Sequence, residues 1–318
     1  MYEPTFFWQS YPLVIHMTIG IPRALGYHRY GTLWETFFEE LNIPYVVSAE
    51  TNQKLLDDGL KHTVDESCLP LKLYMGHVAS LLNQCDKLLV PRFLRLGKQE
   101  EFCVRFWGLT DTVQSTFEGA ELLTYHLKSR YFDTEPLGFL QMGRSLGKGT
   151  IASAKAYRIA KQRGMETDFR RLVQSRARLR SPAPQILLAA QPYIAYDPFL
   201  GGTVARLVQR LGGIPLFADG WDRTACREAS REISQDIYWA QNREILGAIH
   251  LARGRVDGVI LLTAFPCGSD CLANELVLRR VKDVPVIQLL LDEHQSQEGL
   301  QTRLESLLDM IAQRRENQ

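Results

Sequence analysis

The 318-residue chain has no long apolar segment, no excess of charge of either sign and few cysteines. Its longest nearly continuous apolar runs, at 259–265 and 286–291, are much shorter than the roughly 18–20 residues of a membrane-spanning helix. The first twelve residues contain no Lys or Arg, so they lack the charged start of a signal or transit peptide. We therefore expect a soluble, cytoplasmic protein that does not bind a membrane.

The charges of the chain nearly cancel, since 37 Lys and Arg face 36 Asp and Glu and leave a formal net charge of +1. Such a balance provides no global field to attract nucleic acid, so we expect no nucleic-acid partner. Six cysteines are too few for a disulfide scaffold in a chain of this length. In a reducing compartment they are buried small hydrophobic residues, reactive thiols or metal ligands.

Strand and helix patterns alternate in both halves of the sequence. The periodicity predicts helices at 33–41 and 69–82, with a short strand at 44–47 between them and a strand at 87–90 after them. It also predicts later strands at 185–190, 256–265 and 286–291, separated by helices. Alternation of this kind is typical of a parallel sheet that is covered by helices on both faces. The unbroken apolarity of 259–262 and 287–291 predicts central strands that are buried on both sides.

The two halves are separated by a helical stretch that ends at Ser181-Pro182-Ala183-Pro184, where two prolines favour a domain boundary. We predict an α/β fold of two Rossmann-like lobes, each a doubly wound parallel sheet. The lobes span 12–140 and 183–318, and a helical connector at 141–182 joins them. Within the connector, the glycine string 143–150 follows a predicted strand at 137–142 but departs from the spacing of a Walker A loop, which argues against nucleotide binding there.

Three cysteines stand where ligands commonly gather. Cys68 directly precedes a helix, and Cys267 follows the buried strand 256–265, at the edge of a parallel sheet where ligands bind. Cys103 lies in a loop after a strand of the other lobe and could face Cys267 across the cleft between the lobes. Cys85 and Cys226 have settings typical of structural cysteines. No C-x2-C pair is present, which excludes a zinc ribbon or ferredoxin repeat, and leaves a shared cluster and structural thiols both open.

A polar group, Asp292-Glu293-His294, ends the strand at 286–291. A carboxylate beside a histidine at a strand end suits either an acid–base site or a capping turn. The residues alone leave both alternatives open.

Several stretches together resemble one family. The chain is similar to the stand-alone form of the domain fused behind the ATPase module in acyl-CoA dehydratase activase-related proteins, and to the iron–sulfur subunits of 2-hydroxyacyl-CoA dehydratases, benzoyl-CoA reductases and double-cubane cluster proteins. The resemblance covers both lobes. The matching stretches are 19–52, DESCLPLKLYMGHVASLL (65–82), DKLLVPR (86–92), QPYIAYDP (191–198), DGVILLTAFPCGSDC (257–271) and DEHQSQEGLQTRLESLLDMI (292–311).

The resemblance implies an oxygen-sensitive iron–sulfur cluster between the lobes, with Cys68, Cys103 and Cys267 as its ligands. The family's Cys-Gly-Pro-Asp-Ser reads Cys267-Gly268-Ser269-Asp270-Cys271 here, which makes Cys271 a candidate fourth ligand. A [4Fe-4S] cluster fits this set better than a double-cubane cluster, which needs more thiolates. Six residues are candidates for the surroundings of the cluster: Arg23, Glu66, Lys72, His77, Asp292 and His294.

The function that the resemblance implies is that of a redox component in an acyl-CoA dehydratase- or reductase-like system. It would accept low-potential electrons from an ATP-dependent activase on a separate chain, with an acyl-CoA as substrate, in a homodimer or a heterodimer. Three thiolates would leave one iron open to the substrate, whereas a fourth from Cys271 would make the cluster an electron carrier. The alternative is a non-catalytic interaction or scaffold protein that retains the fold.

Overall fold

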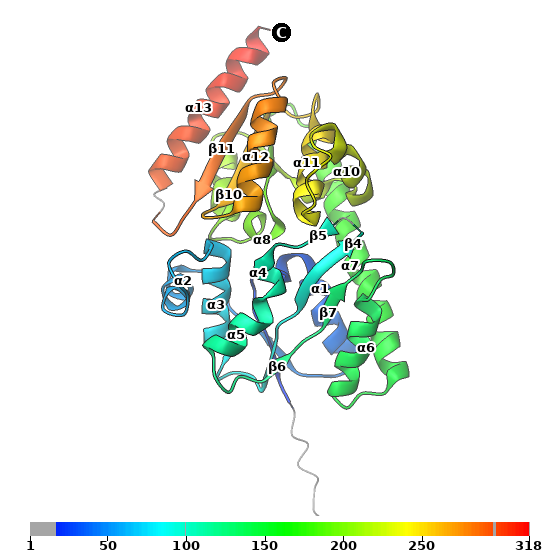
Figure 1. Cartoon of the computed structure of the whole chain (residues 1–318). Coiled ribbons are helices and arrows are strands. Elements are labelled where there is room, and N and C mark those ends of the chain that lie inside the picture. Colours follow the sequence, from blue (N-terminus) through cyan, green and yellow to red (C-terminus); the bar gives the residue numbers. More distant parts are fainter. Residues whose placement is uncertain (1–16, 99, 295–296, 318) are drawn as a thin grey trace, which may run out of the picture.

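The computed structural model describes residues 17–98, 100–294 and 297–317, which form two α/β lobes with a long helix along one side of both (Figure 1). Met1–Pro12 and the first residues of the predicted lobe 12–140 lie outside the described residues. Within the described part of the chain, no helix is both long and apolar enough to cross a membrane. The two-lobe α/β fold is confirmed, while the predicted boundaries at 140 and 183 stay a prediction.

The first lobe is built on a parallel sheet with the strand order β2-β1-β3-β6. Its strands are β1 (Ile19–Ile21), β2 (Tyr45–Val47), β3 (Lys87–Leu89) and β6 (Leu122–Leu123). The helices around it are α1 (Tyr27–Glu40), α2 (Gln53–Leu60), α3 (Leu69–Leu81) and α5 (Leu109–Thr116). On α1 the apolar side chains recur at helical spacing, and Trp34, Phe37 and Phe38 are buried in the core of the lobe.

A second, three-stranded sheet in this lobe is absent from the sequence prediction. It has the order β5-β4-β7, with β4 (Arg92–Gly97) antiparallel to β5 (Glu100–Glu101) and parallel to β7 (His126–Lys128). It carries the chain from the end of β3 to the short helix α4 (Val104–Trp107). The predicted loop around Cys103 is therefore held at the end of a sheet.

The second lobe has a parallel sheet with the order β11-β10-β8-β9. Its strands are β8 (Gln185–Ala189), β9 (Ile214–Phe217), β10 (Gly258–Ala264) and β11 (Val286–Leu291). Its helices are α8 (Pro192–Ala195), α9 (Gly201–Arg210), α10 (Arg223–Ala229), α11 (Ala240–Ala252), α12 (Gly268–Arg280) and α13 (Gln297–Glu316).

The two strands predicted to be central differ in their burial. β10 is buried along its whole length, as predicted. The prediction for 287–291 is wrong, because β11 is an edge strand and its Leu290 is 37% exposed. The apolar character of β11 has another cause: Leu289 and Leu291 pack in one cluster with Leu304 and Leu307 of α13.

The connector is helical, with α6 (Glu135–Ser145) followed by α7 (Thr150–Arg178), a helix of 29 residues. The predicted strand at 137–142 is wrong, because this segment lies inside α6, where Phe139 and Met142 face the core at helical spacing. A short apolar run fits a strand or a helix equally well by periodicity. The glycine string thus joins two helices, and Gly143 packs against Ser153 of α7.

Candidate functional site

Cys68, Cys103 and Cys267 occupy the same position in three different helices. Each is the last extended residue before a helix, at the starts of α3, α4 and α12 respectively. Burial raises the pKa of all three thiols. The backbone N–H groups of the first helical turn oppose this effect, as a helix N-terminus does for an anion, and lower each pKa.

The helices that these cysteines precede, α3, α4 and α12, begin where the two lobes meet (Figure 1). The N–H of Leu69 donates to the carbonyl of Phe265 over 2.9 Å, which joins the start of α3 to the segment that follows β10. The charge of Cys103 raises the pKa of Cys68, and the charge of Cys68 raises that of Cys267. The lobes therefore bring together thiols that lie up to 199 positions apart in the sequence, between residues 68 and 267.

Tyr193, on α8, is close enough to all three thiols to be affected by their charges. Burial is the main cause that raises the pKa of its hydroxyl. The charge of Asp270 and those of the thiolates of Cys267, Cys103 and Cys68 raise this pKa as well. Its ring lies 5.8 Å from the ring of Phe106 on α4, so an aromatic contact joins α8 of the second lobe to α4 of the first. The sequence places Tyr193 in the QPYIAYDP stretch that matches the family, shortly after β8, but does not mark it as a residue of the site.

Asp270, in the first turn of α12, is 4% exposed and was also missed by the sequence analysis. Its Oδ1 accepts hydrogen bonds from Gln191 Nε2 at 2.8 Å and Asn242 Nδ2 at 2.7 Å. Burial raises the pKa of Asp270, and the two amide donors lower it. These bonds tie α12 to the end of β8 and to α11, and so fix the helix turn that follows Cys267. The signal in the sequence is an acidic residue between two cysteines in the CGSDC motif.

Lys72 lies one turn after Cys68 and is 2% exposed. Its ammonium donates to both carboxylate oxygens of Glu293, at 2.9 and 3.0 Å, so the pair joins the two lobes. Glu293 is thus the member of the polar group after β11 that contacts the first lobe. Asp292 and His294 are exposed, and Asp292 Oδ1 accepts the backbone N–H of His294 at 2.9 Å, the geometry of a turn.

His77 and Arg23 belong to a separate hydrogen-bond network. The buried His77 ring contacts Ser48 Oγ at 2.8 Å and Thr51 Oγ1 at 3.0 Å, while the Arg23 side chain donates to the carbonyl of Ser48. Thr51 in turn donates to Asp197 of the second lobe. The placement of these residues beside a cluster stays a prediction, as does that of Glu66, which is exposed.

The remaining cysteines differ from the three at the junction. Cys226 is buried at 1% exposure, and the half-buried Cys85 donates to the carbonyl of Leu81. Cys271 is exposed, so it is not a buried small hydrophobic residue, which is one of the three roles expected for the cysteines. Among residues 17–98, 100–294 and 297–317, no three or more His, Cys, Asp or Glu side chains converge as ligands of one metal ion.

Comparison with known proteins gives one family. The family described as the CoA enzyme activase uncharacterised domain matches residues 18–220. No curated protein matches the chain. Two solved structures align weakly. Zn(II)-bound AdcAII from Streptococcus pneumoniae is 8% identical over 93% of this chain and 98% of its own, with a TM-score of 0.28. Mn2+-bound FpvC from Pseudomonas aeruginosa is 10% identical over 93% and 99%, with a TM-score of 0.30.

Proposed function

The chain belongs to the CoA enzyme activase uncharacterised domain family, and from this premise we propose that it is an iron–sulfur redox component of an acyl-CoA dehydratase- or reductase-like system. Cys68, Cys103 and Cys267 would hold a [4Fe-4S] cluster, which supplies one-electron chemistry at low potential. The electrons would come from a separate ATP-dependent activase chain. One observation carries the proposal. Three cysteines from the two lobes each stand at the start of a helix, and all three are near Tyr193.

The donor set suits such a cluster better than it suits one metal ion. Each thiolate of a cubane cluster binds a different iron, so the sulfur atoms need not converge on one point. Backbone N–H groups at the starts of α3, α4 and α12 favour the anionic form of each thiol. The residues therefore fit the cofactor in chemistry and in electrostatics.

The number of ligands favours substrate chemistry over simple electron transport. Cys271 is exposed, which supports a site with three protein thiolates and one iron without a protein ligand. Tyr193 and Phe106 would exclude water from this side, while Gln191 and Asn242 hold Asp270 in place beside Cys267. A double-cubane cluster would need more thiolates than these three.

The first test is the composition of the protein purified without oxygen. We expect a brown protein with bound iron and sulfide and a broad absorption band in the visible region. A colourless protein that takes up no iron during anaerobic reconstitution would instead support the scaffold alternative.

The second test asks which thiols bind. Cys68→Ala, Cys103→Ala and Cys267→Ala should each lose most of the iron and sulfide, because one missing thiolate leaves an iron without a ligand. Cys271→Ala, on the same helix as the ligand Cys267, and Cys85→Ala should keep the iron content and the spectrum of the unmodified protein. Retention of iron in Cys68→Ala together with its loss in Cys271→Ala would show that the ligand set is wrong.

A further inference from the structure

Helix α7 packs on the protein through its small side chains and exposes its large ones. The residues of α7 that are buried are Ser153, Ala156, Ala160 and Ser175. Ile151, Met165, Phe169 and Val173 are between 47% and 86% exposed. This is the reverse of the usual arrangement of a surface helix, whose large apolar side chains face the core. An exposed apolar surface of this kind marks an interaction site.

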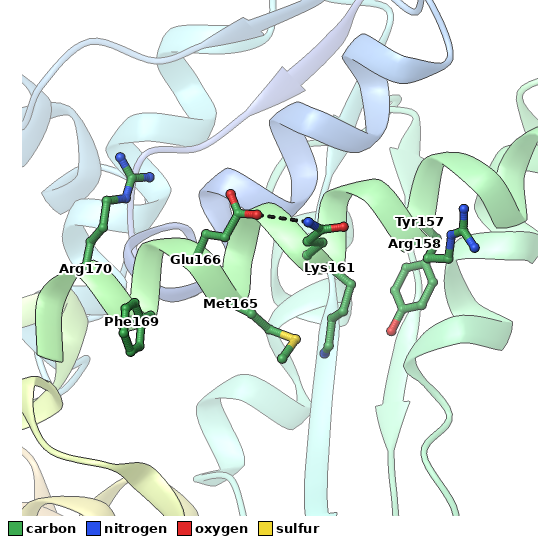
Figure 2. A pocket seen from close by; sticks show the side chains of 8 residues that line it. Tyr157, Arg158, Lys161, Met165, Glu166, Phe169 and Arg170 are labelled. Carbon is green, nitrogen blue, oxygen red and sulfur yellow. Dashed lines mark hydrogen bonds between the residues drawn. The ribbon is translucent and has the colours of Figure 1, made fainter. Parts of the chain in front are cut away.

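The centre of this surface is a shallow hollow that extends along α7 from Tyr157 to Arg170 (Figure 2). We call it the α7 face. Its eight residues are Tyr157, Arg158, Lys161, Gln162, Met165, Glu166, Phe169 and Arg170. Both apolar and charged groups are present, and the charges are of both signs.

The outward residues follow the spacing of a helix that packs against another helix. Steps of four and three alternate along the chain, which is the heptad repeat of a coiled-coil seam. The seam is Ile151, Lys155, Arg158, Gln162, Met165, Phe169, Leu172 and Arg176. Cationic and polar side chains occupy three of the four positions in its first half, and apolar side chains occupy three of the four positions in its second half. A parallel partner with the same sequence would therefore place like charges together, whereas an antiparallel partner places each half against the other.

The α7 face is complementary to itself about a single point, midway between Arg163 and Gly164. When two copies of α7 lie antiparallel about this point, each residue faces the residue of the other copy that is equally far from the point. The eight residues of the α7 face then form four kinds of pair, and both members of every pair lie on the face. The pairs are Tyr157 with Arg170, Arg158 with Phe169, Lys161 with Glu166, and Gln162 with Met165. Two of them join a cation to an aromatic ring and one joins opposite charges, all of which are favourable contacts.

We propose that the α7 face is the interface of a homodimer, in which two copies of α7 pack antiparallel about a two-fold axis between Arg163 and Gly164. A two-fold interface uses the same surface on both subunits and so requires this self-complementarity. The point lies within one residue of the middle of α7 (Thr150–Arg178), so nearly the whole helix would be paired. Lys161 already donates to Glu135, but it is 43% exposed and has further N–H groups for a second carboxylate.

The test is the oligomeric state of the full chain by sedimentation equilibrium. The unmodified protein should be a dimer, and Phe169→Lys should weaken association by at least roughly tenfold, because each copy would lose a cation–aromatic contact and place a lysine against Arg158 of the other copy. Phe132→Lys is the matched control, since Phe132 is 67% exposed and Phe169 is 65% exposed, and it should remain dimeric. A monomeric unmodified protein, or a Phe169→Lys protein as dimeric as the control, would overturn the proposal.

A charge exchange tests the antiparallel register. Lys161→Glu and Glu166→Lys should each weaken the dimer. The first would place two carboxylates opposite each other, and the second two ammonium groups, and the pair occurs twice in the dimer. A mixture of the two variants should form a heterodimer with complementary charges at both positions, detected by mass spectrometry of the intact complex. Thermal melts would establish that each variant is folded. Two folded variants that fail to associate more strongly when mixed would contradict this register.

Discussion

Lys72 and Glu293 form an ion pair across the junction of the lobes, with the lysine side chain 3% and the glutamate side chain 22% exposed. Glu293→Gln should lower the free energy of unfolding by about 1–3 kcal/mol, because the buried ammonium loses its countercharge. Lys72→Met should lower it less, since the remaining glutamate is partly hydrated. Urea denaturation of both variants measures these changes.

The double variant Lys72→Met/Glu293→Gln separates the pair from other effects at the two positions. Its loss of stability should be smaller than the sum of the single losses, because no charge is left buried without a partner. Strictly additive losses would show that the two side chains do not interact. At this scale the sequence supplies Lys72, one turn from Cys68, but not its partner, which is 221 positions away and meets it only through the docking of the lobes.

At the scale of elements, α2 and α3 pack so closely that glycines form the contact. A Cβ on Gly59 would overlap the carbonyl oxygen of Lys72, and a Cβ on Gly76 would overlap that of Leu55. Gly76→Ala should therefore force the two helices apart and lower the free energy of unfolding by about 3 kcal/mol. Denaturant melts with Gly164→Ala as the control test this prediction.

The control places the same methyl group in a helix where there is room for it. A Cβ on Gly164 of α7 meets no atom within 4 Å, so alanine there should raise the free energy of unfolding by up to about 1 kcal/mol through its helix propensity. Equal effects of the two substitutions would mean that the close approach of α2 and α3 does not limit stability.

The sequence predicts helices and strands well where the apolar periodicity is long and strong. It predicts them poorly where the structure of a segment depends on pairing with a distant strand. The predicted bounds of the buried strand β10 are close to the observed ones, because a continuous apolar run marks it. Those of the helix α3 are close as well, because Pro70 in the first turn marks where the helix begins. The segment 137–142 was taken for a strand and is helical, since six residues do not distinguish the two periods. Strand β4 was missed because its pairing depends on β7, 34 positions later between residues 92 and 126.

For the whole molecule, the sequence predicts the three cysteines at element ends but not the residues that complete the site. Tyr193, Asp270 and Asn242 come from α8, α12 and α11 and meet only when the second lobe is folded. No local pattern marks such residues, because their spacing along the chain is unrelated to their distances in space. A glutamine or asparagine that binds a buried carboxylate resembles any polar residue in the sequence.

A second network crosses the junction of the lobes and contains two buried histidines. His77 bonds to Ser48 and Thr51, Thr51 donates to Asp197, and His28 Nε2 lies 4.0 Å from Asp197 Oδ2. Burial, aided by the charges of His28 and Arg23, lowers the pKa of His77 to about 3. Burial, aided by the charges of Arg171 and Arg23, lowers the pKa of His28 to about 4. Burial raises the pKa of Asp197, so this carboxyl group takes up a proton more readily than usual.

These shifts predict that acid weakens the folded state well above the pH at which ordinary carboxylates titrate. Below a pH of about 6.5 the unfolded chain protonates both histidines and the folded chain does not, so stability falls as the pH falls. Between pH 7 and pH 5 the free energy of unfolding should decrease by about 2–4 kcal/mol. His77→Gln, which keeps hydrogen-bonding groups but does not titrate, should remove roughly half of this slope. His294→Gln, at an exposed position, should leave the slope unchanged. Urea denaturation across this pH range measures it, and equal slopes for His77→Gln and His294→Gln would exclude the buried histidine as the cause.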